Sequence, residues 1–215
     1  MGDVMQALTR DDLCAWMIRF ASAVLAEQEM LSDLDAAGGD ADHGANLARG
    51  MAAVAAGLPE MLTPVGSMCK DIGLVLVDTI GGSSGALYGT IFLRLAQAAG
   101  LSAPTLDLQT LARGFQSAAQ GITERGGAKP GDKTMLDALF PAVLALRREA
   151  DRGCSLPLAL SLAASAAEEG AQSTRTMQAR RGKASYLGVG SVGTIDPGAK
   201  STSMMMRCLA DTISR

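Results

Sequence analysis

The segment 34–46 concentrates carboxylates beside the only histidine of the chain. Its sequence is LDAAGGDADHGAN, in which Asp35, Asp40 and Asp42 stand among alanine and glycine without an adjacent lysine or arginine. Carboxylates this close raise one another's pKa unless a cation lies among them. Oxygen ligands suit Mg²⁺ or Ca²⁺. We therefore predict a divalent-metal site followed directly by His43; the alternative is a solvated acidic turn in which Asp42 caps a helix.

Three more polar, glycine-containing segments resemble this one in chemistry: 81–85, 126–133 and 180–195. Each precedes an expected helix, and a helix N-terminus presents free N–H groups that favour phosphate. Glycine also permits close approach of the backbone to a ligand. Neither GxxxxGK[ST] nor GxGxxG after a strand is present. Together with the acidic segment, these loops predict binding of a Mg²⁺–nucleotide.

The composition indicates a single all-α domain over 1–215. The 215 residues suffice for one core, and 48% of them are apolar while only 3% are aromatic. Such a core is aliphatic, and its leucines and alanines are strong helix formers. A net charge of −3 provides no basic field, so we expect no nucleic-acid partner.

The cysteines and the apolar runs restrict where the protein can work. Four cysteines lie far apart without CxxC spacing, which predicts buried thiols in a reducing cytoplasm rather than a zinc site. The longest apolar run, 72–77, is too short to span a bilayer, and no signal-peptide pattern is visible. We expect a cytoplasmic protein without membrane insertion.

The hydrophobic periodicity predicts eight helices. Thr9 caps the first, and Asp196 with Pro197 begins the last. In an up-and-down array, alternate loops lie at the same end, so the four unusual loops would meet at one rim. The expected helices are 9–31, 44–57, 68–80, 85–99, 107–122, 134–150, 155–179 and 197–213.

Five motifs in order resemble the L subunit of dihydroxyacetone kinases, the DhaL family, which also occurs as the nucleotide domain of single-chain kinases. The similarity covers nearly the whole chain. Two departures stand out: Lys183 replaces a frequent arginine, which keeps the charge but loses the bidentate fork, and Gly38 replaces a larger apolar residue. The motifs are Asp35 with GDADHG at 39–44, GGSSG at 81–85, KPGDKTM at 129–135, ASYLG at 184–188 and DPGA at 196–199.

The resemblance implies an eight-helix antiparallel up-and-down barrel or bundle with the nucleotide at one rim. It implies that Asp35, Asp40 and Asp42 hold two Mg²⁺ ions against the phosphates of ADP or ATP, with a phosphate contact from Lys183. The other implied nucleotide contacts are His43, Gly44, Ala45, Asn46, Ser83, Ser84, Gly126, Met135, Asp196, Pro197 and Gly198.

The resemblance also implies a kinase subunit that works with a partner. A K subunit would hold dihydroxyacetone, or a related small ketose, covalently through its own histidine, and this chain would deliver the phosphoryl group. The donor is either bound ADP recharged by a phosphocarrier protein of the phosphotransferase system, or exchanging ATP. No general base is evident in these motifs. The motifs do not decide whether the chain forms a homodimer. The alternative is a regulatory or lipid-binding module of the same fold.

Overall fold

The computed structural model describes residues 7–214 and confirms the all-α prediction. Over these residues the only β feature is an isolated antiparallel bridge between Leu8 and Leu106. Short 3₁₀ helices occupy Leu58–Glu60, Thr174–Thr176 and Lys183–Ser191. The α-helices are α1 (Arg10–Ala26), α2 (Gln28–Ala36), α3 (His43–Gly57), α4 (Val65–Thr79), α5 (Gly82–Ala99), α6 (Leu108–Gly126), α7 (Leu136–Asp151), α8 (Leu156–Ser173) and α9 (Pro197–Ile213).

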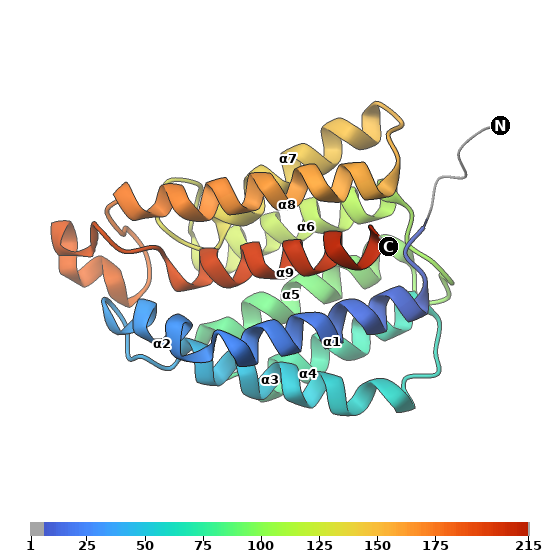
Figure 1. The fold of residues 1–215 in the computed structure, drawn as a ribbon, viewed down its shortest axis with the longest axis horizontal. Helices are drawn as coiled ribbons and strands as arrows, with labels where there is room; N and C mark the ends of the chain where they lie inside the picture. The colour runs from blue at the N-terminus through green and yellow to red at the C-terminus, as the bar shows by residue number, and fades with distance from the viewer. Residues whose placement is uncertain (1–6, 215) are drawn as a thin grey trace.

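The helices run back and forth along the long axis of the molecule and form a closed ring (Figure 1). From α3 onward each helix packs against the next, and α9 returns to contact α1. The seam carries a long-range hydrogen bond, because the indole Nε1–H of Trp16 donates to the carbonyl of Met205 at 3.0 Å. The first and last helices therefore complete the ring together.

The interior of the ring is mainly aliphatic, with a few aromatic side chains at its centre. Trp16, Phe92 and Phe115 are fully buried, and the Trp16 and Phe92 ring centroids lie 5.4 Å apart. Phe20 and Tyr88 are also buried and stack at 6.4 Å. Among the described helices, none combines the length and apolarity needed to cross a membrane.

The first predicted helix is wrong in one respect: it is broken at Glu27 into α1 and α2. No proline or glycine marks the break in the sequence. At this point Gly44 of α3 packs directly on the carbonyl of Gln28, where a Cβ atom would collide. The extra helix, α2, packs against α3 and α9. Asp35 therefore lies in the last turn of a helix and not in a loop.

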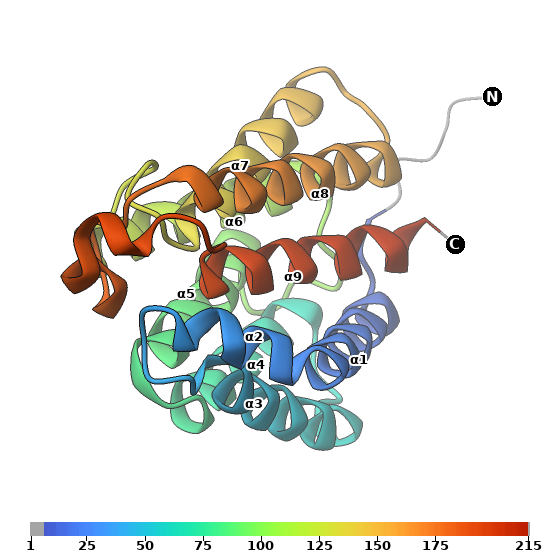
Figure 2. The ribbon, with the colours of Figure 1, turned by 60° about the vertical axis from the view of Figure 1, so that its left-hand side comes forward.

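Four other predicted boundaries move by three residues or more: α4 and α5 begin earlier than predicted, at Val65 and Gly82, and α6 and α8 end at different residues, both at the same end of the ring. Helix α6 extends to Gly126, which we had placed in a loop, and ends at Gly127 in the left-handed region with φ 60°. Helix α8 ends at Ser173, earlier than predicted, and the chain continues into irregular structure. The long segments that follow α2, α6 and α8 gather at one end, opposite the C-terminus (Figures 1 and 2).

Candidate functional site

The three aspartates predicted as metal ligands converge. Asp35, at the end of α2, and Asp40 and Asp42, in the next loop, each offer a carboxylate oxygen within 4.8 Å of the others. The backbone N–H of Asp42 donates to Asp35 Oδ2 at 3.0 Å, and Ala41 takes a left-handed φ of 60° that folds the loop back. Three negative charges at this separation are suited to a divalent cation.

Among the described residues, one basic side chain forms an ion pair with this acidic cluster. Lys183 reaches across from the 183–191 segment and forms an ion pair with Asp40. Its hydrogen bond holds the pKa of Asp40 below the usual range. One lysine against three carboxylates leaves the cluster net negative, so the donor set fits Mg²⁺.

A cavity of about 650 Å³ opens beside the acidic cluster. It lies between the ends of α2 and α6, the start of α5 and the segments before α7 and α9. The structure therefore brings together most of the predicted site. The predicted residues that line the cavity are Asp35, Asp40, Asp42, His43, Ser83, Ser84, Gly126, Met135, Lys183, Asp196, Pro197 and Gly198.

Three of the residues predicted to contact nucleotide do not line this cavity. Gly44 is buried against α2, and Ala45 is exposed on α3. Asn46 accepts a hydrogen bond from Arg49 at 2.7 Å and lies close to Gly81. Their contact with nucleotide stays a prediction.

The start of α5 is open toward the cavity. Gly81 is its N-cap and has no side chain to accept from the first-turn N–H groups, and Gly82 takes a φ of 66° that few other residues adopt. Ser83 and Ser84 follow in the first turn and face the same space. Free N–H groups and hydroxyls at a helix N-terminus form a site suited to phosphate.

Among the other helices that begin at this end, α9 and α3 differ in their first residues. Asp196 caps α9 by accepting from the N–H of Ala199 at 2.8 Å, which confirms its predicted N-cap role. Burial raises the pKa of Asp196 to about 7. His43 begins α3 and is buried, and this burial lowers the pKa of its imidazole. The ring is therefore neutral at pH 7.

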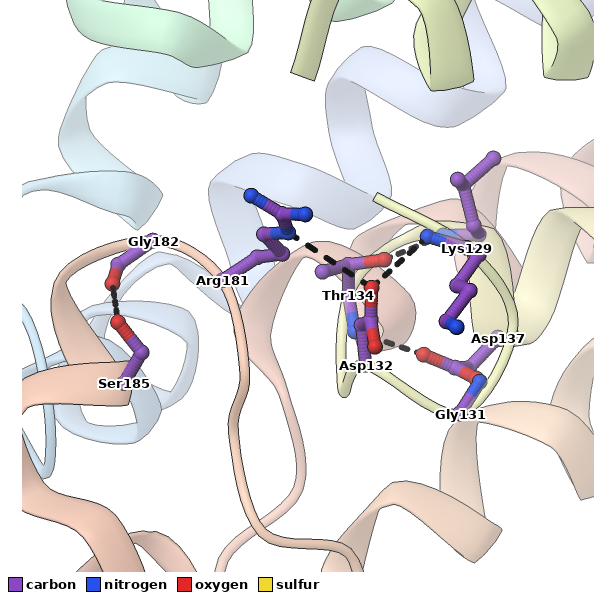
Figure 3. A network of polar contacts seen from close by, with 9 residues as sticks. Lys129, Gly131, Asp132, Thr134, Asp137, Arg181, Gly182 and Ser185 are labelled. Carbon is purple, nitrogen blue, oxygen red and sulfur yellow. Dashed lines mark hydrogen bonds and ion pairs between the residues drawn. The ribbon is translucent and has the colours of Figure 1, made fainter. Parts of the chain in front are cut away.

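The loop before α7 is held by carboxylates that accept from its own backbone (Figure 3). Asp137 accepts from Gly131 N at 2.5 Å and from Thr134 N at 2.8 Å. Asp132 accepts from Lys129 N at 3.0 Å. Its carboxylate also lies 3.8 Å from the guanidinium of Arg181, which lines the cavity from the other side.

Lys133 is a structural residue that the sequence did not reveal. Asp132 and Lys133 could have been a surface pair, but both are buried. The Lys133 ammonium donates to the carbonyls of Ser191 and Thr194, each at 2.6 Å, and its backbone has a φ of 62°. Burial lowers its pKa. Lys133 thus ties the loop before α7 to the segment before α9.

Other residues that line the cavity were missed because they lie in irregular structure or on a buried helix face. Arg181 was not among the predicted contacts, although its position before Lys183 in a glycine-containing loop was a usable signal. The remainder had no signal in a single sequence. They include Leu87, Tyr88, Ile122, Ser191, Thr194 and Ile195.

Together, the fold and the site define a class: a ring of helices that joins an acidic cluster to an open helix N-terminus at one end, an arrangement suited to a metal–phosphate ligand. The chain belongs to the DAK2 domain family, whose model matches residues 37–211. The sequence-based recognition of the family is confirmed.

Three similar proteins show the range of the family. The ADP-binding subunit DhaL of the PEP-dependent dihydroxyacetone kinase of Escherichia coli K12 is 44% identical over 95% of this chain and 97% of its own length. The L-erythrulose kinase of Pectobacterium atrosepticum is 35% identical over 89% of this chain, which spans 33% of that protein. The crystal structure of the C. freundii dihydroxyacetone kinase with AMP-PNP and Mg²⁺ matches with a TM-score of 0.70 and 28% identity, over 97% of this chain and 35% of that one.

Proposed function

We propose that this chain is the Mg²⁺–nucleotide-binding subunit of a kinase that phosphorylates dihydroxyacetone or a related small ketose. One observation carries the proposal: Asp35, Asp40 and Asp42 converge beside the open start of α5 in a single cavity. The relatives named as an ADP-binding kinase subunit and as an AMP-PNP–Mg²⁺ complex support it. The unit that carries this function is one domain, 1–215.

The residues of the cavity divide into an acidic and a phosphate-binding part. The three aspartates would hold Mg²⁺, two ions by the family resemblance, and bound Mg²⁺ neutralises phosphate charge during phosphoryl transfer. Ser83, Ser84 and the first N–H groups of α5 would bind phosphate oxygens. Lys183 would move from Asp40 toward the phosphates once a metal replaces its charge.

The apolar part of the cavity suits a nucleobase. Leu87, Ile122, Ala128 and Met135 line it next to Gly126, on the side formed by α5 and α6. A Cβ at Gly126 would meet nothing within 4 Å, so this part of the backbone leaves room for a flat ring. This division places phosphates at α5 and the base toward α6.

The acceptor and its activation are assigned to a partner. The two ring nitrogens of the one imidazole at the cavity already face the hydroxyls of Ser201 and Ser84, so His43 is not free to act as a base toward the acceptor. We propose that a K subunit holds the ketose and docks at this rim. Exposed apolar side chains stand there beside Lys183, with Tyr186 exposed to 90% and Val189 to 75%. The relatives act on different ketoses, so specificity would lie on the partner.

Calorimetric titration of ADP with and without Mg²⁺ tests the binding part of the proposal. We expect tight binding that disappears when EDTA removes the metal. Transfer is then tested by mixing the chain with a K-type subunit, dihydroxyacetone and either ATP or a phosphorylated phosphocarrier protein. Binding without transfer from either donor would favour the regulatory alternative.

Copurification distinguishes the two donors. ADP that stays bound through purification and exchanges slowly indicates a coenzyme recharged in place by a phosphocarrier. Rapid exchange indicates direct use of ATP. Labelled ADP added to the purified protein, followed by gel filtration at successive times, measures the exchange rate.

A further inference from the structure

A chain of buried hydroxyl groups runs beneath the site and ends at His43. The phenol of Tyr88, on α5, donates to Ser201 Oγ on α9 at 2.7 Å. Ser201 Oγ in turn lies 2.8 Å from His43 Nε2. All three side chains are buried, with exposed fractions of 1%, 0% and 7%. The sequence did not predict Tyr88 or Ser201 as site residues.

The other edge of the same imidazole faces the ligand side. His43 Nδ1 lies 3.4 Å from Ser84 Oγ in the first turn of α5. The backbone N–H of His43 also points to Asp35 Oδ2 at 3.4 Å. His43 therefore contacts the carboxylate of Asp35 through its backbone, and its ring lies between Ser84 at the start of α5 and Ser201 in the first turns of α9.

The donors in this chain can be assigned from chemistry. Burial raises the pKa of Tyr88 to about 12, so its phenol keeps its hydrogen and donates. Ser201 has one hydrogen and competing acceptors, because the carbonyl of Pro197 lies at 2.9 Å. Tyr88 is therefore the group that keeps the Ser201 oxygen beside His43 Nε2. The Ser201 hydroxyl already lies within hydrogen-bond distance of the carbonyls of Pro197 and Gly198 in its own helix, so loss of the phenol removes the contact that holds it from α5.

We propose that Tyr88 and Ser201 are positioning residues for nucleotide binding, which act by fixing the imidazole plane of His43 between Ser84 and α9. The inference rests on the proposed function, since it assigns these groups to the same Mg²⁺–nucleotide site. Comparable outer groups behind metal ligands change affinity when they are removed, by about 10–100-fold.

Two variants remove the chain with little change in shape: Tyr88→Phe and Ser201→Ala. We expect each to weaken Mg²⁺–ADP binding by about 10-fold in calorimetry. The double variant should lose no more than Ser201→Ala alone, because both side chains act through one ring. Thr212→Val is the matched control, since it removes a buried α9 hydroxyl at the opposite end, where Thr212 donates to Cys208 O at 2.8 Å. Its ADP affinity should equal that of the wild type.

A direct readout is available because the sequence contains a single histidine. The ¹⁵N signals of its imidazole, recorded without nucleotide, report tautomer and hydrogen bonding at His43 alone. Tyr88→Phe and Ser201→Ala should shift these signals, whereas Thr212→Val should not. Unchanged signals in both variants overturn the inference, whether or not affinity falls.

The two proposals fail in different ways. If the wild type does not bind Mg²⁺–ADP, the proposed function fails. If the wild type binds and both variants bind equally well, only the positioning role fails. Circular dichroism melting of each variant identifies any loss of affinity that comes from unfolding.

Discussion

Of the helices that start at the end of the ring opposite the site, α1, α4 and α6 have first-turn N–H groups that are bonded within the protein, whereas α5 at the site end has no side-chain cap. Thr9 caps α1 through a capping box, and Asp107 caps α6 by accepting from Thr110 N at 2.7 Å. The N–H of Gly66 at the start of α4 donates to the carbonyl of Ala103 at 3.1 Å. These contacts use first-turn N–H groups to stabilise the fold.

At the site end, the starts of α5 and α3 lack side-chain caps that would stabilise the protein. Gly81 offers α5 no capping side chain, and Asp42 makes no side-chain cap at α3. The carboxylates of Asp35, Asp40 and Asp42 repel one another, and one lysine, Lys183, forms an ion pair with Asp40. A ligand that carries Mg²⁺ and phosphate satisfies both deficits. Changes at the two ends should therefore separate stability from affinity.

The largest separation is expected from Asp40→Ala. This variant removes a proposed metal ligand and should weaken Mg²⁺-dependent ADP binding by on the order of 100-fold. Unfolding free energy should not fall, because the change relieves repulsion in the acidic cluster. Titration calorimetry and urea denaturation measure the two effects.

The control for Asp40→Ala is Asp33→Ala, which removes the same charge from an exposed position on α2. Its ADP affinity should stay near that of the wild type. Equal losses in the two variants would mean that general charge, not ligation, is responsible. Wild-type affinity in Asp40→Ala and Asp42→Ala together would contradict the metal site.

Lys133→Met tests whether the site end also contains purely structural contacts. The change removes two hydrogen bonds from a buried ammonium to Ser191 and Thr194. We expect the free energy of unfolding without ligand to fall by about 2–3 kcal/mol. Exposed Lys129→Met in the same loop should stay within about 0.5 kcal/mol of the wild type. A loss no larger than that of Lys129→Met would mean that the two carbonyl contacts do not anchor the loop.

Gly38→Ala tests how closely the metal loop packs on the segment before α9. A Cβ at Gly38 would lie 2.7 Å from Ala184 Cβ, so one of the two segments must shift. We expect ADP affinity to fall about fivefold, equivalent to about 1 kcal/mol of overpacking. The double variant with Ala184→Gly should recover part of it, since the Cα of residue 184 still lies 3.0 Å from the added Cβ. If it does not, the contact with Ala184 is not the cause.

The smallest effect is expected from Asp107→Ala at the opposite end, which removes the cap of α6. The free energy of unfolding should fall by about 1 kcal/mol with no change in ADP affinity. Hydrogen bonds from Thr110 hold the pKa of Asp107 below its usual range. The cap is therefore fully effective above a pH of about 4, the unfolded value, and is lost as pH falls through the folded pKa. The difference from the wild type should shrink in acid; a constant difference would assign it to helix propensity.

The sequence predicted the fold class, and most of its predicted site residues line one cavity, because each part leaves a local pattern. Trp16, Met17, Phe20 and Val24 follow helical spacing, and all four are buried on α1. The aspartates of 34–46 similarly predict carboxylates that converge, although Asp35 lies in the last turn of α2 and not in the loop. Such features depend on near neighbours in the chain, which one sequence displays.

Features set by contacts between distant segments could not be predicted. The break at Glu27 coincides with the packing of Gly44 on the carbonyl of Gln28 in α2. Glu27 and Gln28 are not residue types that end a helix, so the sequence does not show the break. The burial of Lys133 depends on carbonyls 58 and 61 positions away. Ser201 read as an ordinary helical serine, because its partner Tyr88 lies 113 positions earlier.

The seam between α1 and α9 also provides an internal optical probe. Trp16 is the only tryptophan, and its indole is hydrogen-bonded to a carbonyl 189 positions further along the chain. Its fluorescence therefore reports one event, the arrival of the last helix beside the first. Since α9 also carries Asp196 and Ser201, stopped-flow emission during refolding should follow the moment at which the cavity becomes able to hold a ligand.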